Sequence, residues 1–121
     1  MTGLIEEIAG HRVLVCGADG PLVQKEANAL ALLGDAMSQE AGWVLMPAAR
    51  LHPDFFRLAS GLAGGVAQKF VNYRVKLAVV GDIAAQLEKS APLRDFVRET
   101  NKGPHLWFIE NRAEFERKLT P

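Results

Sequence analysis

The stretch of sequence that decides the fold class is ASGLAGGVAQKFVNYRVKLAVVGD, residues 59–82. In its first half Leu62, Val66 and Phe70 recur every four residues, as apolar side chains do on one face of a helix. Residues 75–81, VKLAVVG, follow directly and form the continuous apolar run that is typical of a strand covered on both faces. A helix that leads straight into a buried strand indicates an α/β fold.

The rest of the chain extends this alternation. Two short β-like runs at the N-terminus, separated by Gly10 and His11, predict a hairpin, and helix and strand patterns then alternate to the C-terminus. Strands are predicted at 3–10, 11–17, 43–48, 75–81 and 105–110. Helices are predicted at about 24–41, from near Asp54 or from Ser60 up to the strand at 75–81, from after Ser90 to Gly103, and after Asn111. A polar loop is predicted between the strand at 75–81 and Ser90.

The order ββαβαβαβα predicts a single α/β domain over residues 1–121, with a mixed, mostly parallel sheet under helical cover. The strands at 43–48, 75–81 and 105–110 are expected to be parallel neighbours, because each is joined to the next by a helix of crossover length.

Composition and charge exclude several classes of function. Lysine plus arginine and aspartate plus glutamate each total 14, so no basic excess favours nucleic acid or an anionic membrane. The N-terminal residues lack the basic and apolar regions of a signal peptide, and no run approaches the roughly 20 apolar residues of a membrane span. We therefore expect a cytoplasmic protein. Cys16 lies in an apolar run and is expected to be a buried small hydrophobe.

The chain lacks the recognisable motifs for cofactors and metals. Residues 61–69 contain three glycines but not the Gly-Lys-Ser/Thr ending of a phosphate-binding loop, and residues 16–21, CGADGP, lack the dinucleotide fingerprint. The three histidines have no partner at a ligand spacing, so no metal site is expected. A glycine inside a helix costs about 1 kcal/mol relative to alanine. Gly64 and Gly65 are therefore interpreted as sites of either close packing or close approach to a ligand.

Three side chains remain as candidate binding or regulatory residues. Ser60 lies near the expected start of a helix, where its hydroxyl can cap the helix and where a phosphate would also be favoured. If the helix begins at Ser60, the hydroxyl should accept from a backbone N–H two or three residues on, with Ala63 as the preferred donor. Ser60→Asp should then nearly retain stability. Asp82 follows a buried strand, where ligands gather in α/β sheets or where a turn forms. Arg94 lies on the next helix and is kept as a partner for Asp82 in a cleft.

Two families resemble this sequence. Residues 54–82, DFFRLASGLAGGVAQKFVNYRVKLAVVGD, and residues 90–103, SAPLRDFVRETNKG, resemble an uncharacterised family of short bacterial proteins over nearly the whole chain. The order of elements, with Ser60-Gly61 opening a helix after a central strand, is also similar to STAS domains, the sulfate-transporter and anti-sigma-factor-antagonist modules. The Asp-Ser that usually precedes the Ser-Gly there is replaced by Leu58-Ala59, so phosphorylation of Ser60 is implied only by position.

Two hypotheses about function follow. The first is a non-enzymatic, STAS-like interaction or signalling module, in which Ser60, Gly61, Gly64 and Asp82 mark a surface that binds a partner protein or a small anion. The alternative is a small ligand-binding protein or enzyme that uses Asp82 and Arg94 in a cleft at the strand ends. A homodimer is left open under both hypotheses. A deep pocket with convergent polar groups would favour the second hypothesis, and a shallow, partly apolar surface would favour the first.

Overall fold

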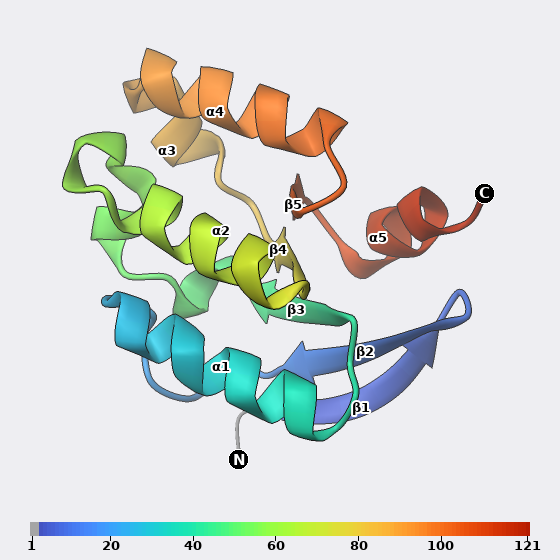
Figure 1. Cartoon of the computed structure of the whole chain (residues 1–121). Helices are drawn as coiled ribbons and strands as arrows, with labels where there is room; N and C mark the ends of the chain where they lie inside the picture. Colours follow the sequence, from blue (N-terminus) through green and yellow to red (C-terminus); the bar gives the residue numbers. More distant parts are fainter. Residues whose placement is uncertain (1–2) are drawn as a thin grey trace.

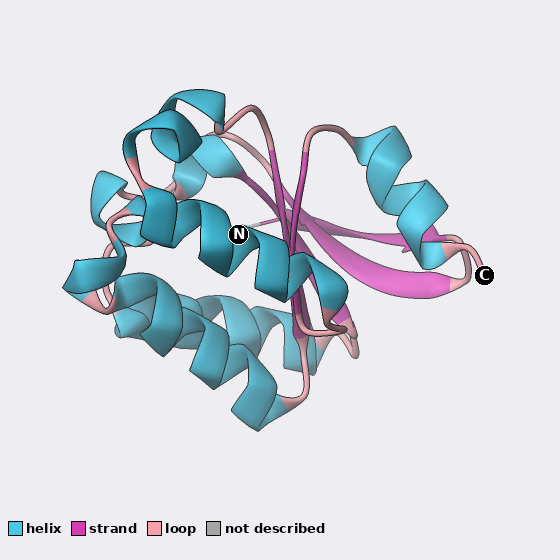
Figure 2. Cartoon of the chain, turned by 90° about the horizontal axis from the view of Figure 1, so that it is seen from above, coloured by secondary structure: helices cyan, strands magenta, loops and turns pink. Residues whose placement is uncertain are grey.

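The computed structural model describes residues 3–121, which form a five-stranded sheet with helices on both faces (Figures 1 and 2). The strands are β1 (Gly3–Ile8), β2 (His11–Cys16), β3 (Trp43–Pro47), β4 (Lys76–Val80) and β5 (Leu106–Ile109). The helices are α1 (Glu26–Ser38), α2 (Leu62–Tyr73), α3 (Ala84–Lys89), α4 (Ala91–Lys102) and α5 (Arg112–Leu119). Three short 3-10 helices, Ala48–Arg50, Pro53–Phe56 and Leu58–Ser60, connect β3 to α2.

The predicted N-terminal hairpin and parallel strands are confirmed. β1 pairs antiparallel with β2, and β2, β3, β4 and β5 are all parallel. The hairpin turn consists of Ala9 and Gly10, whose φ angles of 51° and 82° are both positive, as a type I′ turn requires. His11 therefore begins β2 and does not belong to the turn.

The strands lie in the sheet in the same order as in the chain, β1-β2-β3-β4-β5. Because crossovers between parallel strands are right-handed, crossovers that all step in one direction place their helices on one face of the sheet. Figure 2 shows α1, α2 and α4 together on that face, and α5, which no strand follows, on the other. The two faces consequently have separate cores.

Alternating side chains of the strands fill the two cores. Val44 and Met46 of β3 join the core under α1, α2 and α4, whereas Trp43 and Leu45 join the core under α5. The ring centroid of Trp43 lies 4.5 Å from that of Trp107 and 5.3 Å from that of Phe115 in α5. Trp43, Trp107 and Phe115 are thus core residues.

The helix boundaries differ from the predicted ones in three places. α1 is shorter than 24–41, because Glu40 takes the left-handed conformation (φ 61°) just after the helix. α2 begins at Leu62, later than either predicted start. Residues 84–89 form α3 and not a polar loop, because Ala84, Ala85 and the residues that follow favour a helix even with a single apolar contact from Leu87.

Candidate functional site

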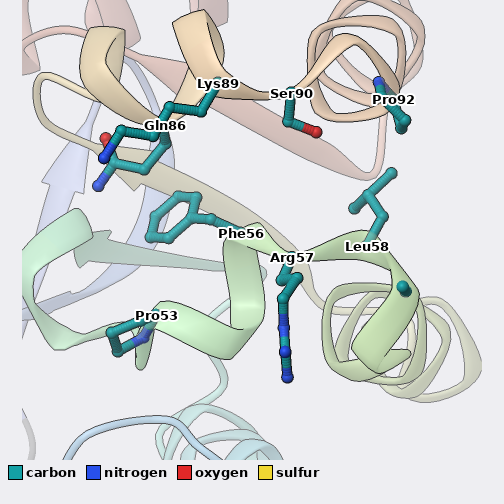
Figure 3. A pocket seen from close by; sticks show the side chains of 9 residues that line it. Pro53, Phe56, Arg57, Leu58, Gln86, Lys89, Ser90 and Pro92 are labelled. Atoms are coloured by element: carbon teal, nitrogen blue, oxygen red, sulfur yellow. The ribbon is translucent and has the colours of Figure 1, made fainter.

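A groove lies on the described surface at the edge where the parallel strands end. One wall is the 3-10 segment that follows β3, and the other is α3 and the start of α4, which follow β4 (Figure 3). Its volume is about 510 Å³. Loops at the carboxyl ends of parallel strands are the usual place for ligands in α/β sheets.

The lining of the groove combines an apolar floor with basic groups. The lining residues are Pro53, Phe56, Arg57, Leu58, Ala59, Gln86, Lys89, Ser90 and Pro92. Figure 3 shows the Phe56 ring in the middle of this set, with Pro53 on one side and Gln86 and Lys89 on the other. Arg57 and Lys89 are the charged members, and both are cationic. The groove therefore presents apolar surface and positive charge together.

Two local features shape the walls of this groove. The Ser90 hydroxyl accepts from the N–H of Leu93 at 3.1 Å, and this cap fixes the start of α4 beside the groove. The Arg57 guanidinium forms an exposed ion pair with Asp54, at 3.2 Å, within the 3-10 segment. Asp54 does not line the groove, so the ion pair fixes the Arg57 guanidinium without placing a carboxylate inside the groove.

Ser60 lies next to the groove but is not the cap of α2. The N-cap is Gly61, in the left-handed conformation (φ 80°), and Ser60 ends the preceding 3-10 helix. The Ser60 hydroxyl donates to the carbonyl oxygen of Asp54 at 2.6 Å and accepts from the N–H of Leu62 at 3.2 Å. The donor lies two residues on, within the expected range of two or three, but it is Leu62 and not Ala63. Ser60 thereby ties the 3-10 segment to the start of α2.

A second, polar hollow of about 360 Å³ contains Ser60 and Gly61. Its other lining residues are Gln24, Lys25, Glu26, Asp54 and Leu62. Two carboxylates share this hollow with Ser60, and a carboxylate at position 60 could not donate to the Asp54 carbonyl. The structure therefore removes the reason for expecting Ser60→Asp to be neutral for stability.

The two helix glycines differ in what surrounds them. A Cβ added at Gly65 would lie 2.5 Å from Oε2 of Glu26, so Gly65 leaves room for the end of this flexible side chain. A Cβ added at Gly64 would meet no atom within 4 Å. Gly64 is exposed, lines neither hollow and has no packing reason within the chain.

Asp82 and Arg94 are not brought together. Asp82 lines a third hollow, of about 240 Å³, together with Glu110 and Glu114, and its carboxylate accepts from the N–H of Ala84 at 2.9 Å, which is the turn-forming role. Arg94 does not line that hollow. Its guanidinium donates to the carbonyl oxygen of Leu87 at 2.7 Å, at the end of α3. Each residue stabilises the end or start of α3, and they do not share a cleft.

The sequence analysis missed Arg50, which organises the loop after β2. Arg50 is only 2% exposed, and its guanidinium is directed to backbone carbonyl oxygens. It donates to the carbonyl oxygens of Pro21 at 2.9 Å and Gly17 at 3.0 Å. Gly20 (φ 135°) is required beside it, since a Cβ there would lie 3.0 Å from the guanidinium carbon. A charged residue immediately after a buried strand was the available signal.

Among residues 3–121, three groups have a shifted pKa. A hydrogen bond from Arg112 lowers the pKa of the Glu6 carboxyl, and the same contact raises the pKa of Arg112. Burial raises the pKa of the Cys16 thiol to about 11, and the nearby Arg50 charge opposes this shift. The expectation of a buried, structural Cys16 is confirmed by its 5% exposure. None of these three groups lines the groove.

Residues 3–121 contain no cluster of three or more histidine, cysteine, aspartate or glutamate side chains that could hold a metal ion. Over the same residues, no helix has the length and apolar character needed to cross a bilayer.

Fold and surface together define an α/β protein with a five-stranded mixed sheet and an apolar, basic groove at the strand ends. The chain belongs to the family described as a domain of unknown function (DUF4180), whose profile matches residues 8–119. The assignment to an uncharacterised family is thereby confirmed. Comparisons with curated proteins and with solved structures found no match.

Proposed function

We propose that this protein is a non-enzymatic binding module with a STAS-like arrangement, which takes a segment of a partner protein in the groove beside Ser60 and Gly61. The observation that carries the proposal is the lining of that groove, where Phe56, Leu58 and the two prolines form the apolar part and the charges are those of Arg57 and Lys89. The partner segment that fits this lining has apolar side chains and at least one carboxylate.

The balance of apolar and charged groups favours a peptide over a small anion. A small anion would need several donors that converge on one point, as at a nest of backbone amides or a pair of arginines. Here the two basic side chains come from different walls of the groove, Arg57 from the 3-10 segment and Lys89 from α3. Apolar contacts can therefore provide most of the binding free energy, while the charges select an acidic partner and speed its association.

The STAS-like assignment rests on the order of elements. An antiparallel strand pair is followed by alternating helices and parallel strands, and Ser60-Gly61 directly precedes a helix after a central strand. Two differences from the expected pattern remain: Leu58-Ala59 before Ser60, and the start of α2 at Leu62. We therefore place recognition in the groove and assign Ser60 to holding one wall of it.

A peptide selection tests the proposal directly. A random peptide library displayed on phage is selected against the purified protein, and an enriched peptide is labelled for fluorescence polarisation. We expect the enriched peptides to combine apolar residues with aspartate or glutamate. Lys89→Glu should weaken binding about tenfold, because a repulsive charge replaces an attractive one at a partly desolvated contact. The matched control is Arg98→Glu, on the exposed side of α4 away from the groove lining.

Three results would contradict the proposal. They are a selection with no acidic-apolar preference, equal weakening by Lys89→Glu and Arg98→Glu, and amide chemical-shift changes on peptide binding that lie outside residues 53–61 and 86–92. A further check on the apolar contact is Leu58→Asp, which should abolish binding while the far-UV circular dichroism stays that of the folded protein, since Leu58 is only half-buried.

A further inference from the structure

The solvent-facing side of α1 is apolar and uncharged. Leu30 and Met37 on this side are 41% and 50% exposed. The other exposed residues of this side are small and uncharged: Ala27, Ala31, Gly34 and Ser38. Of the two charged residues of α1, Glu26 is directed to Lys69 of α2, 3.8 Å away, and Asp35 is half-buried. The exposed apolar side chains therefore form one stripe along the helix.

This stripe differs from the exposed side of α4, which covers the same face of the sheet (Figure 1). The exposed side of α4 carries five charged residues: Arg94, Asp95, Arg98, Glu99 and Lys102. A helix face in contact with water usually resembles that of α4. Depletion of charge around exposed leucine and methionine is instead typical of the centre of a protein interface.

Gly34, in the middle of the stripe, has no structural reason within a single chain. A Cβ added there would meet no atom within 4 Å, and its φ is not among the positive values of this backbone. A glycine inside a helix nevertheless disfavours the helix relative to alanine. Gly65 shows the contrasting case, since the Glu26 carboxylate occupies the space that its Cβ would need. The space beside Gly34 is therefore open to a neighbour from outside the chain.

The stripe is complementary to itself. Ala27 and Gly34 are seven residues apart, as are Leu30 and Met37, so the helix presents two small and two large residues at the spacing of a helix–helix seam. In one antiparallel register of two such helices, Met37 of each copy lies opposite Ala27 of the other, and Leu30 lies opposite Gly34. Each large side chain then meets a small one, and no like charges meet across the symmetry axis.

We propose that this stripe, residues Ala27, Leu30, Ala31, Gly34, Met37 and Ser38, is the interface of a symmetric homodimer in which the α1 helices of two copies pack antiparallel. The occupant is a second copy of this chain, because the large and small residues that must match are both present on one helix. The interface is separate from the groove at residues 53–59 and 86–92, so the two proposals can fail independently.

Sedimentation velocity over a range of protein concentrations tests the proposal. The wild type should show a concentration-dependent monomer–dimer equilibrium. Met37→Lys should raise the dissociation constant at least about tenfold, because a charge would be buried opposite Ala27. The matched control is Leu4→Lys, which alters a side chain that is 67% exposed in β1, outside the stripe, and should change the constant less than about twofold.

Two further variants test the glycine and the register. Gly34→Ala should raise the thermal unfolding midpoint of dilute, monomeric protein while it weakens the dimer, an opposite pair of effects that a purely structural glycine would not give. When Ala27→Cys and Met37→Cys proteins are mixed, a disulfide between one chain of each variant should form faster than a disulfide between two chains of the same variant. The native Cys16 is too buried to interfere. A wild type that is monomeric at every concentration would overturn the proposal. Equal effects of Met37→Lys and Leu4→Lys on the dissociation constant would overturn it as well. So would a disulfide that forms faster between two Ala27→Cys chains than between an Ala27→Cys chain and a Met37→Cys chain.

Discussion

Replacement of Arg50 by methionine tests the role of the buried guanidinium. The side chain of methionine fills much of the same space, but it cannot donate to the carbonyl oxygens of Pro21 and Gly17, which lie 2.9 Å and 3.0 Å from the guanidinium nitrogens. A hydrogen bond to a charged group contributes about 1.5–3 kcal/mol. Loss of two such bonds corresponds to about 3–6 kcal/mol.

Part of this loss is offset. Arg50 is a buried charge whose guanidinium donates to backbone carbonyl oxygens, so its removal also relieves the cost of desolvating a charge. We expect a net decrease of about 3 kcal/mol in the free energy of unfolding. Urea denaturation followed by circular dichroism measures it, with Arg57→Met as the control, because the Arg57 side chain is 70% exposed. The control should change stability by less than about 0.5 kcal/mol. A decrease below about 1 kcal/mol for Arg50→Met would refute the reasoning.

Three further outcomes are expected. Ser60→Ala should lower the free energy of unfolding, measured by urea titration, by about 0.5–2 kcal/mol, whereas Ser60→Asn keeps both a donor and an acceptor and should retain more stability. Equal losses would contradict the role of Ser60 in tying the 3-10 segment to α2. The rise in the Cys16 pKa from 9.0 to about 11 lowers the thiolate fraction about a hundredfold. A thiol reagent should therefore react with the native protein at least about a hundredfold more slowly than with the protein unfolded in urea. Comparable rates would show that the thiol is accessible. The pKa of Glu6 is lowered in the folded state, so its ion pair with Arg112 stabilises the fold at pH values above 4.5, the ordinary pKa, and this stabilisation is lost as the pH falls through the folded pKa. The wild type should therefore be more stable than Glu6→Gln at pH 7, and the difference should shrink below pH 4.5. A difference that does not depend on pH would contradict the assignment.

The sequence predicts most of the sheet well because the strands after β1 consist mainly of apolar residues with clear boundaries. Residues 43–48, 75–81 and 105–110 have the composition of buried strands, and the helices that join them lead to their parallel pairing. The helix starts are less well predicted. Apolar residues recur every four positions from Leu58 into α2, across the end of a 3-10 helix. This periodicity does not reveal the positive φ of Gly61, which separates the 3-10 helix from α2.

The candidate site was predicted only in part, because its residues come from two loops whose approach depends on the whole sheet. Ser60 and Gly61 follow the 3-10 wall of the groove in the chain, but the groove itself is formed by Phe56 and Leu58 against Lys89 and Pro92. Nothing in the local pattern of 53–59 indicates that the start of α4 lies against it. Contacts between segments that follow different strands become visible only when strand order is known.

The order of the strands in the sheet also has a consequence for how the chain folds. Every strand pairs only with the strands before and after it in the chain, so each pairing closes a single hairpin or crossover and the contacts stay local. We expect such a chain to build its sheet progressively from neighbouring units. The ion pair of Glu6 with Arg112 is different, since it joins residues separated by 106 positions. It can form only when β1 and α5 are both in place, and its formation therefore marks the completion of folding and not its beginning.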